Sequence, residues 1–262
     1  MQTHTLMVAL AVIGAITLGA SNAVRFGGFP ARVVLAAIAL IATAVFLGGR
    51  LHFALPRLHV FAHEPLQVLR LSSGGLHAPG AICGGVLGGW LGLRALGLPV
   101  ARFADAFTPA VALGIGIARL GCFLNGCCFG DLCTLPWGLS MPPNSLPFLE
   151  QIERGLLAHD ASHSLPVHPL PLYFSLAALS MAVLLTWIQR RKNYDGQVAL
   201  WFFFLFSLTS TLLEPLRTDH EMRVYWGPMP QLQWVTLVMT LIAGGALVRL
   251  SRQRPSTTIT EA

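Results

Sequence analysis

The residues best suited to chemistry gather at positions 114–138, which read GIGIARLGCFLNGCCFGDLCTLPWG. Here an apolar run meets a basic side chain, an amide and four cysteines. Arg119 ends the apolar run 110–118, so a helix at membrane depth would hold its guanidinium near the lipid headgroups. A guanidinium at that level can bind a lipid phosphate. The alternative is an arginine that snorkels and only anchors the helix.

Three glycines follow Arg119 closely, at positions 121, 126 and 130. Glycine lets a backbone approach a ligand and adopt left-handed turns, so this composition favours a binding site over a simple anchor. Asn125 could hold a carbonyl or phosphate oxygen of a lipid. An Asn-Gly pair is also a common turn, so Asn125 and Gly126 are open to both interpretations.

The composition places this segment in a membrane protein. Of 262 residues, 54% are hydrophobic and 11% charged, which leaves too little polar surface to coat a soluble globule. The formal charge is +6, but the basic residues are scattered between apolar runs. Without a basic patch, the charge does not indicate nucleic-acid binding.

We expect an all-α polytopic membrane protein with about seven transmembrane helices, since an apolar stretch of about 20 residues can cross a bilayer. The expected spans are residues 6–24, 33–49, 76–93, 106–118, 170–188, 198–213 and 231–248. The first lacks the basic start of a signal peptide, so we interpret it as a retained span. Pro109 should break the fourth near its start.

Residues 1–250 would form a single membrane domain, with a cytoplasmic tail at 251–262. The polar, proline-rich stretch 125–167 is interpreted as a periplasmic segment folded over the site, with a short helix at 146–157.

The charges predict the orientation. With seven spans, one side carries ten basic and three acidic residues, and the other carries seven basic and eight acidic residues. The positive-inside rule then puts the amino terminus in the periplasm and the carboxyl terminus in the cytoplasm. Arg50, Arg119 and Arg217 would share the periplasmic side.

The cysteines divide into Cys83, within an apolar run, and Cys122, Cys127, Cys128 and Cys133 in the segment described above. The spacing C-x4-C-C-x4-C is not a recognised zinc motif, and no histidine lies nearby in the sequence, so no metal and no cofactor are predicted. If the cluster faces an oxidising periplasm, one or two disulfides are expected.

Three further ionisable residues are candidates. Glu214 and Arg217 lie three residues apart at the end of the sixth span, in the order of a helical ion pair, which could be purely structural. His77 is the ionisable residue at the start of the glycine-rich third span, and it could be a general base or an ordinary interfacial histidine.

The pattern R-L-G-x-F-x-N-G-x-x-x-G, from Arg119 to Gly130, resembles the signature of the prolipoprotein diacylglyceryl transferase family. Further matches lie in the same order along the chain: Leu47-Gly48-Gly49-Arg50, Gly74-Gly75-Leu76, Pro136-Trp137-Gly138, His168-Pro169 with Leu172-Tyr173, and Glu214 with Arg217. The resemblance covers roughly residues 6–250.

This resemblance implies a bacterial inner-membrane enzyme that moves diacylglycerol from phosphatidylglycerol to the thiol of a lipobox cysteine in a prolipoprotein. It implies catalytic roles for Arg119 and Glu214, whereas the catalytic role expected of His77 rests on its own ionisable ring at the start of the third span. The residues implied in phospholipid binding are Arg119, Asn125, Gly126, Arg50, Arg217, His168 and Tyr173. For His168, a structural role at the start of the fifth span is the alternative.

Several polar positions depart from the family pattern. The usual histidine after Gly-Gly-Leu is Pro79, the signature's second asparagine is Cys122, and its acidic residue is Cys127. Phe174 stands where the family carries a glutamate, and Ser210 where it carries an arginine. These departures leave two alternatives: a relative that uses the same phospholipid pocket for another acceptor, or a non-catalytic lipid-binding, transport or cysteine-redox membrane protein.

Overall fold

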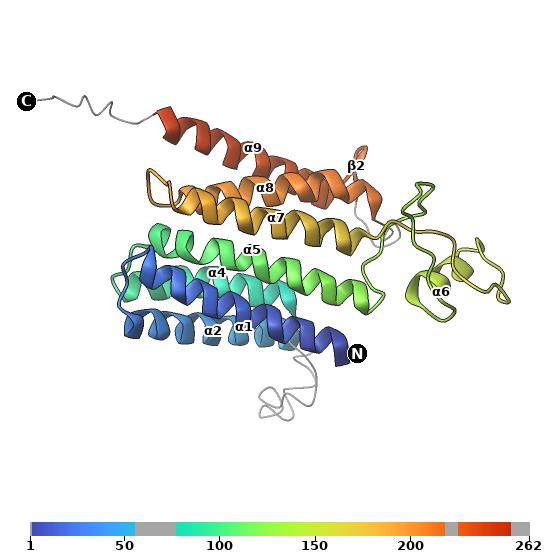
Figure 1. The fold of residues 1–262 in the computed structure, drawn as a ribbon, viewed down its shortest axis with the longest axis horizontal. Helices are drawn as coiled ribbons and strands as arrows, with labels where there is room; N and C mark the ends of the chain where they lie inside the picture. Colours follow the sequence, from blue (N-terminus) through green and yellow to red (C-terminus); the bar gives the residue numbers. More distant parts are fainter. Residues whose placement is uncertain (1, 56–76, 218–224, 253–262) are drawn as a thin grey trace, which may run out of the picture. The chain divides into compact units, whose positions relative to one another are not determined.

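The computed structural model describes residues 2–55, 77–217 and 225–252 of the chain (Figure 1). Its helices are α1 (Gln2–Arg25), α2 (Ala31–Ala54), α4 (Ala78–Ala95), α5 (Val100–Leu124), α6 (Leu146–Glu153), α7 (Leu170–Gln189), α8 (Gln197–Leu213), the 3-10 turn η4 (Glu214–Leu216) and α9 (Gln231–Arg252). The strands β1 (Tyr225–Trp226) and β2 (Met229–Pro230) form a short antiparallel hairpin before α9.

The all-α polytopic membrane fold is confirmed. Each expected span contains a helix, and six of the described helices are long and apolar enough to cross a membrane. The glycine-rich α4 is not among these six, so the number seven is not exactly met. Six of its 18 residues are glycines, which contribute little hydrophobicity. The expected start of this span, residue 76, lies outside the described residues.

Several expected boundaries were wrong, including both ends of the fourth span, which was expected at 106–118 and is observed at Val100–Leu124. Helix α5 begins at Val100 and continues through Pro109, because one missing amide hydrogen does not end a helix that is apolar on both sides. Helix α2 runs past Arg50 to Ala54, and α9 runs to Arg252. The short helix expected at 146–157 ends at Glu153, since Gly155 adopts a left-handed conformation (φ +68°). The rest of the expected tail, 253–262, lies outside the described residues.

The chain divides into two units, which are described separately. One contains the first part of α1 and the chain from Phe107 onwards, and the other contains residues 20–106. In the first, α7 and α8 pack around a buried core whose members are Ala112, Met181, Ala182, Leu185, Ile188 and Val198. The Ser175 hydroxyl, on α7, donates a buried hydrogen bond of 2.9 Å to the Gly116 carbonyl of α5.

Hydroxyl groups join α8 to α9. Thr240 donates to the Ser207 hydroxyl at 2.9 Å, and Thr211 donates to the Thr236 hydroxyl at 2.8 Å. Such interhelical hydrogen bonds between small polar residues are a usual means of packing helices in lipid.

In the second unit, glycines bring α2 and α4 into close contact (Figure 1). A Cβ added at Gly84 would collide with the Ala44 carbonyl oxygen and lie 3.0 Å from the Gly48 Cα. Gly88 packs in the same way against the Ala44 side chain. The expectation that the glycines of this span serve close helix packing agrees with this geometry.

We expect Gly84→Ala to destabilise the protein by about 1 to 3 kcal/mol, because the new methyl group meets backbone atoms that cannot move aside. Gly89→Ala is the matched control on the same helix, since its Cβ would make only ordinary contacts with Ile41, at 3.6 Å and beyond. Thermal unfolding of both variants in detergent measures the difference. Equal melting temperatures would contradict the tight α2–α4 contact.

Candidate functional site

Arg119 lies near the carboxyl end of α5, five residues before the helix ends at Leu124. The side chain is half-buried, and the guanidinium carbon lies 5.0 Å from the centre of the Phe174 ring on α7. This cation–π contact restricts the position of the guanidinium.

The end of α5 is a Schellman motif built on the Asn-Gly pair. The Gly126 amide donates to the Phe123 carbonyl at 3.0 Å, and the Cys127 amide donates to the Cys122 carbonyl at 3.1 Å. Gly126 supplies the left-handed residue that this motif needs, with φ +68°. The turn interpretation of Asn125 and Gly126 therefore holds. The Asn125 side chain is exposed, and its role as a lipid ligand stays a prediction.

The start of α7 carries a hydrogen-bonded aromatic group. The Tyr173 hydroxyl accepts a hydrogen bond of 2.8 Å from the Trp137 indole and lies 3.2 Å from the Nδ1 atom of His168. Tyr173 precedes Phe174 in the chain, so this group adjoins the residue that holds Arg119.

The backbone of His168 connects this group to the end of α8. The Gly130 amide donates to the His168 carbonyl at 2.8 Å, and the Asp131 amide donates to the Leu216 carbonyl at 2.7 Å. A Cβ at Gly130 would lie 2.5 Å from the Leu216 oxygen and 2.7 Å from the His168 Cβ. Only glycine fits this position, which gives the last glycine of the sequence pattern a packing reason.

Glu214 and Arg217 meet as the sequence predicts, although across η4 and not within a longer helix. The carboxylate and guanidinium are 4.0 Å apart, and Glu214 is only 4% exposed. Arg217 also pairs with Gly130 through an isolated antiparallel bridge. Within the first unit, Gly130 thus links two pairs, His168 with Tyr173 and Arg217 with Glu214, and Phe174, the neighbour of Tyr173 in the chain, contacts Arg119.

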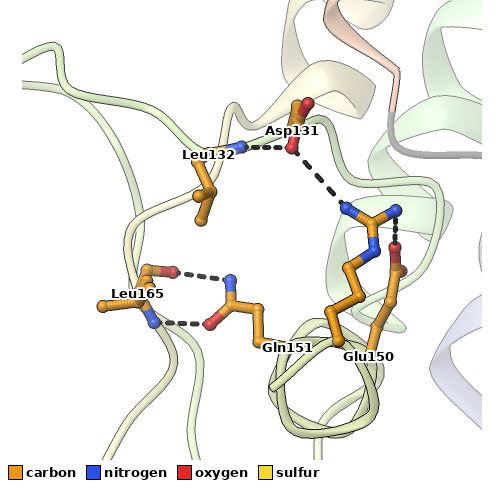
Figure 2. A network of polar contacts seen from close by, with 6 residues as sticks. Asp131, Leu132, Glu150, Gln151 and Leu165 are labelled. Carbon is orange, nitrogen blue, oxygen red and sulfur yellow. Dashed lines mark hydrogen bonds and ion pairs between the residues drawn. The ribbon is translucent and has the colours of Figure 1, made fainter. Parts of the chain in front are cut away.

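The stretch 125–167 is a folded segment held by a polar network (Figure 2). The Gln151 side chain donates to the Leu165 carbonyl at 3.1 Å and accepts from the Leu165 amide at 2.7 Å. Arg154 contacts Glu150 at 2.6 Å and Asp131 at 3.8 Å. These contacts connect α6 to the beginning of the segment at Asp131 and to its end at Leu165.

Arg50 and His77 belong to the second unit. Arg50 is 3% exposed and lies over the Phe53 ring at 5.1 Å. His77 directly precedes α4, and its Nδ1 atom lies 3.1 Å from the Nδ1 atom of His52. The motif Gly74-Gly75-Leu76 lies outside the described residues.

All five cysteines lie in the described part of the chain, and all are free thiols. The expected disulfides are therefore not formed in this structure. Instead, the sulfur atoms of Cys122, Cys127 and Cys128 lie within 4.8 Å of one another. A hydrogen bond to Cys122 and burial raise the pKa of the Cys128 thiol above its usual value, whereas the Arg119 guanidinium acts in the opposite direction.

Comparison with known proteins identifies the family of this chain. Residues 1–249 match the family model of prolipoprotein diacylglyceryl transferase. The chain belongs to this family. Its recognition from the signature around Arg119 is confirmed.

Relatives named phosphatidylglycerol--prolipoprotein diacylglyceryl transferase occur in distant bacteria. One from Synechococcus elongatus is 32% identical over 84% of this chain and 74% of its own length. The second such protein of Streptomyces coelicolor is 30% identical over 97% of this chain and 77% of its own length. One from Clostridium tetani is 28% identical over 95% and 92%. The similarity is therefore not confined to a few motifs.

Sequence reasoning missed three side chains that contact the family residues. Phe174, noted only as a departure from the family pattern, contacts Arg119, Trp137 binds Tyr173, and His52 contacts His77. Trp137 was noted within Pro136-Trp137-Gly138, but its partner is 36 positions away. His52 offered a signal, because it lies two residues after Arg50 on the same helix.

Proposed function

We propose that this protein transfers the diacylglyceryl group of phosphatidylglycerol to the cysteine thiol of a prolipoprotein lipobox, forming a thioether. The observation that carries this proposal is the family match over residues 1–249, together with relatives named for phosphatidylglycerol and prolipoprotein. The held position of Arg119 at the end of a membrane helix supports it from the structure.

In this reaction the acceptor sulfur attacks the glycerol carbon that carries the phosphate. A carbon–sulfur bond forms, the carbon–oxygen bond breaks, and the phosphate leaves with the second glycerol. Negative charge develops on the departing phosphate, and a guanidinium can bind two of its oxygens at once. Arg119 is assigned this role, since its guanidinium lies over the Phe174 ring and can bind phosphate oxygens through its N–H groups.

The acceptor thiol must lose its proton to become a strong nucleophile. Glu214 is a candidate for the group that assists this loss, and Arg217 supplies a second cation beside it.

His168 and Tyr173, held together at 3.2 Å, are assigned to the binding of lipid oxygens. Asn125 and Gly126 at the end of α5 are assigned the same task. Arg50 and His77, in the other unit, keep the lipid-binding and catalytic roles predicted from the sequence.

We expect Phe174→Leu to lower the transfer rate by about 2- to 30-fold, because a lost cation–π contact costs about 0.5 to 2 kcal/mol and leaves Arg119 less well positioned. The measurement is the rate of lipobox-peptide modification by the purified variant. Phe174→Tyr keeps the ring and should retain most of the activity. A fully active Phe174→Leu variant would show that the contact with Arg119 is not needed.

The protein is proposed to lie in the bacterial inner membrane with its amino terminus and the segment 125–167 in the periplasm. The excess of basic residues on the opposite side supports this orientation. A periplasm-active reporter fused after Arg254 should be silent, whereas the same reporter fused within residues 156–163 should be active. The reverse pattern would overturn the orientation.

Two assays test the function. The gene should restore lipoprotein maturation in bacteria depleted of their own transferase. In vitro, a lipobox peptide incubated with the purified protein and phosphatidylglycerol should gain the mass of one diacylglyceryl group. Phospholipid binding without peptide modification would favour a relative that uses another acceptor.

A further inference from the structure

The geometry points to a metal site that the family assignment does not include: we propose that Cys122, Cys127 and Cys128 bind one thiophilic divalent cation of the Zn²⁺ type. The proposal concerns metal binding and does not depend on the transferase reaction.

The end of α5 assembles the first two ligands. In a Schellman motif, the residue after the left-handed glycine packs against the helical residue five positions earlier. Those residues are Cys127 and Cys122 in this chain, and the Cys127 thiol lies 3.5 Å from the Cys122 carbonyl oxygen. The helix terminus thus brings two sulfurs together that the spacing C-x4-C alone would not.

Backbone conformation brings in the third ligand. Cys128 has φ +61°, a left-handed conformation that costs a residue with a side chain about 1 to 2 kcal/mol. This conformation places the Cys128 sulfur 3.9 Å from the Cys127 sulfur. Strained residues of this kind are concentrated at functional sites, and here the strain brings three sulfurs together.

The sulfur positions fit a shared ion. With metal–sulfur bonds of about 2.3 Å, ligand sulfurs lie about 3.8 Å apart around a tetrahedral ion. The three sulfurs of the chain already lie within 4.8 Å of one another, so small side-chain rotations suffice. A disulfide would use two of them and leave the third unused, whereas a metal ion uses all three. Water or an external ligand would complete the tetrahedron.

Charge favours a divalent ion. Three thiolates and one divalent cation carry a net charge of −1, and the Arg119 guanidinium, three residues before Cys122 on α5, supplies a positive charge that offsets it. A monovalent Cu⁺ ion would leave one more negative charge near the membrane. Uncompensated charge is costly there.

The test uses the full-length chain in detergent, reduced, stripped with a chelator and kept free of oxygen. We expect it to bind one Co²⁺ per chain with the intense thiolate-to-cobalt absorption of a tetrahedral site, and one Zn²⁺ should displace the cobalt. Zn²⁺ should also raise the melting temperature.

Each of Cys122→Ser, Cys127→Ser and Cys128→Ser should lower Co²⁺ affinity by at least about 100-fold, since even loss of an outer-shell partner costs 10- to 100-fold. Cys83→Ser and Cys133→Ser are the matched controls and should bind as the unmodified chain does. Gel filtration of each variant separates loss of the ligand from loss of the fold.

Three outcomes would overturn the proposal. The first is absence of Co²⁺ and Zn²⁺ binding by the reduced chain. The second is binding that persists when all three cysteines are replaced. The third is binding of Cu⁺ alone, which would refute the assignment to a divalent ion.

Discussion

Replacing Arg119 by lysine should lower the rate of lipobox-peptide modification by about 10- to 1000-fold, a loss of roughly 1.4 to 4 kcal/mol of transition-state stabilisation. Lysine keeps the positive charge but lacks the planar fork that binds two phosphate oxygens, and it stacks less well on Phe174. Arg119→Ala removes the cation and should be inactive both in the peptide assay and in cells depleted of their own transferase.

Arg191 provides the matched control. It lies just after the end of α7, and its guanidinium carbon is 4.6 Å from the centre of the Trp187 ring. Like Arg119, it therefore lies near the end of a membrane helix and contacts an aromatic ring. Arg191→Lys should therefore leave activity nearly unchanged. Full maturation activity in Arg119→Ala would refute the proposed mechanism. An Arg119→Lys variant as active as Arg191→Lys would indicate that Arg119 serves only as an anchor, because an anchor requires only a positive charge.

Replacing Glu214 by glutamine should reduce turnover by about 100-fold or more while the protein remains folded. Glutamine has the same shape but cannot accept a proton, and groups that transfer protons contribute about 100- to 10,000-fold to rates. Because Glu214 is buried beside Arg217, a water molecule cannot easily take the place of its carboxylate in the variant. Single-turnover kinetics with the lipobox peptide measure the chemical step directly.

Glu153→Gln, at an exposed carboxylate at the end of α6, is the control and should behave as the unmodified enzyme. If Glu214→Gln lowers the melting temperature but keeps its turnover, the ion pair with Arg217 is structural only. That result would leave the acceptor thiol to be activated by another group.

The sequence alone determined the membrane fold, the positions of the helices and the family. The membrane helices follow from a local property, because a run of apolar residues in lipid must be helical when its backbone groups find no water to bind. The family follows from the glycine, arginine and asparagine residues of its signature, whose spacing is read directly from the chain. The errors lay at helix ends, as where α5 begins nine residues before Pro109 or where α6 ends before the left-handed Gly155, because a single hydrogen bond or a left-handed residue decides the outcome there.

Only the tertiary structure decided which side chains meet. The contact between Arg119 and Phe174 joins residues 55 positions apart, and the bridge between Gly130 and Arg217 joins residues 87 positions apart. No periodicity or spacing records such a pairing, because it depends on how α5, α7 and α8 pack. The three converging cysteines show the same limit at short range, since the C-x4-C-C spacing becomes a possible metal site only through the Schellman turn and the left-handed Cys128.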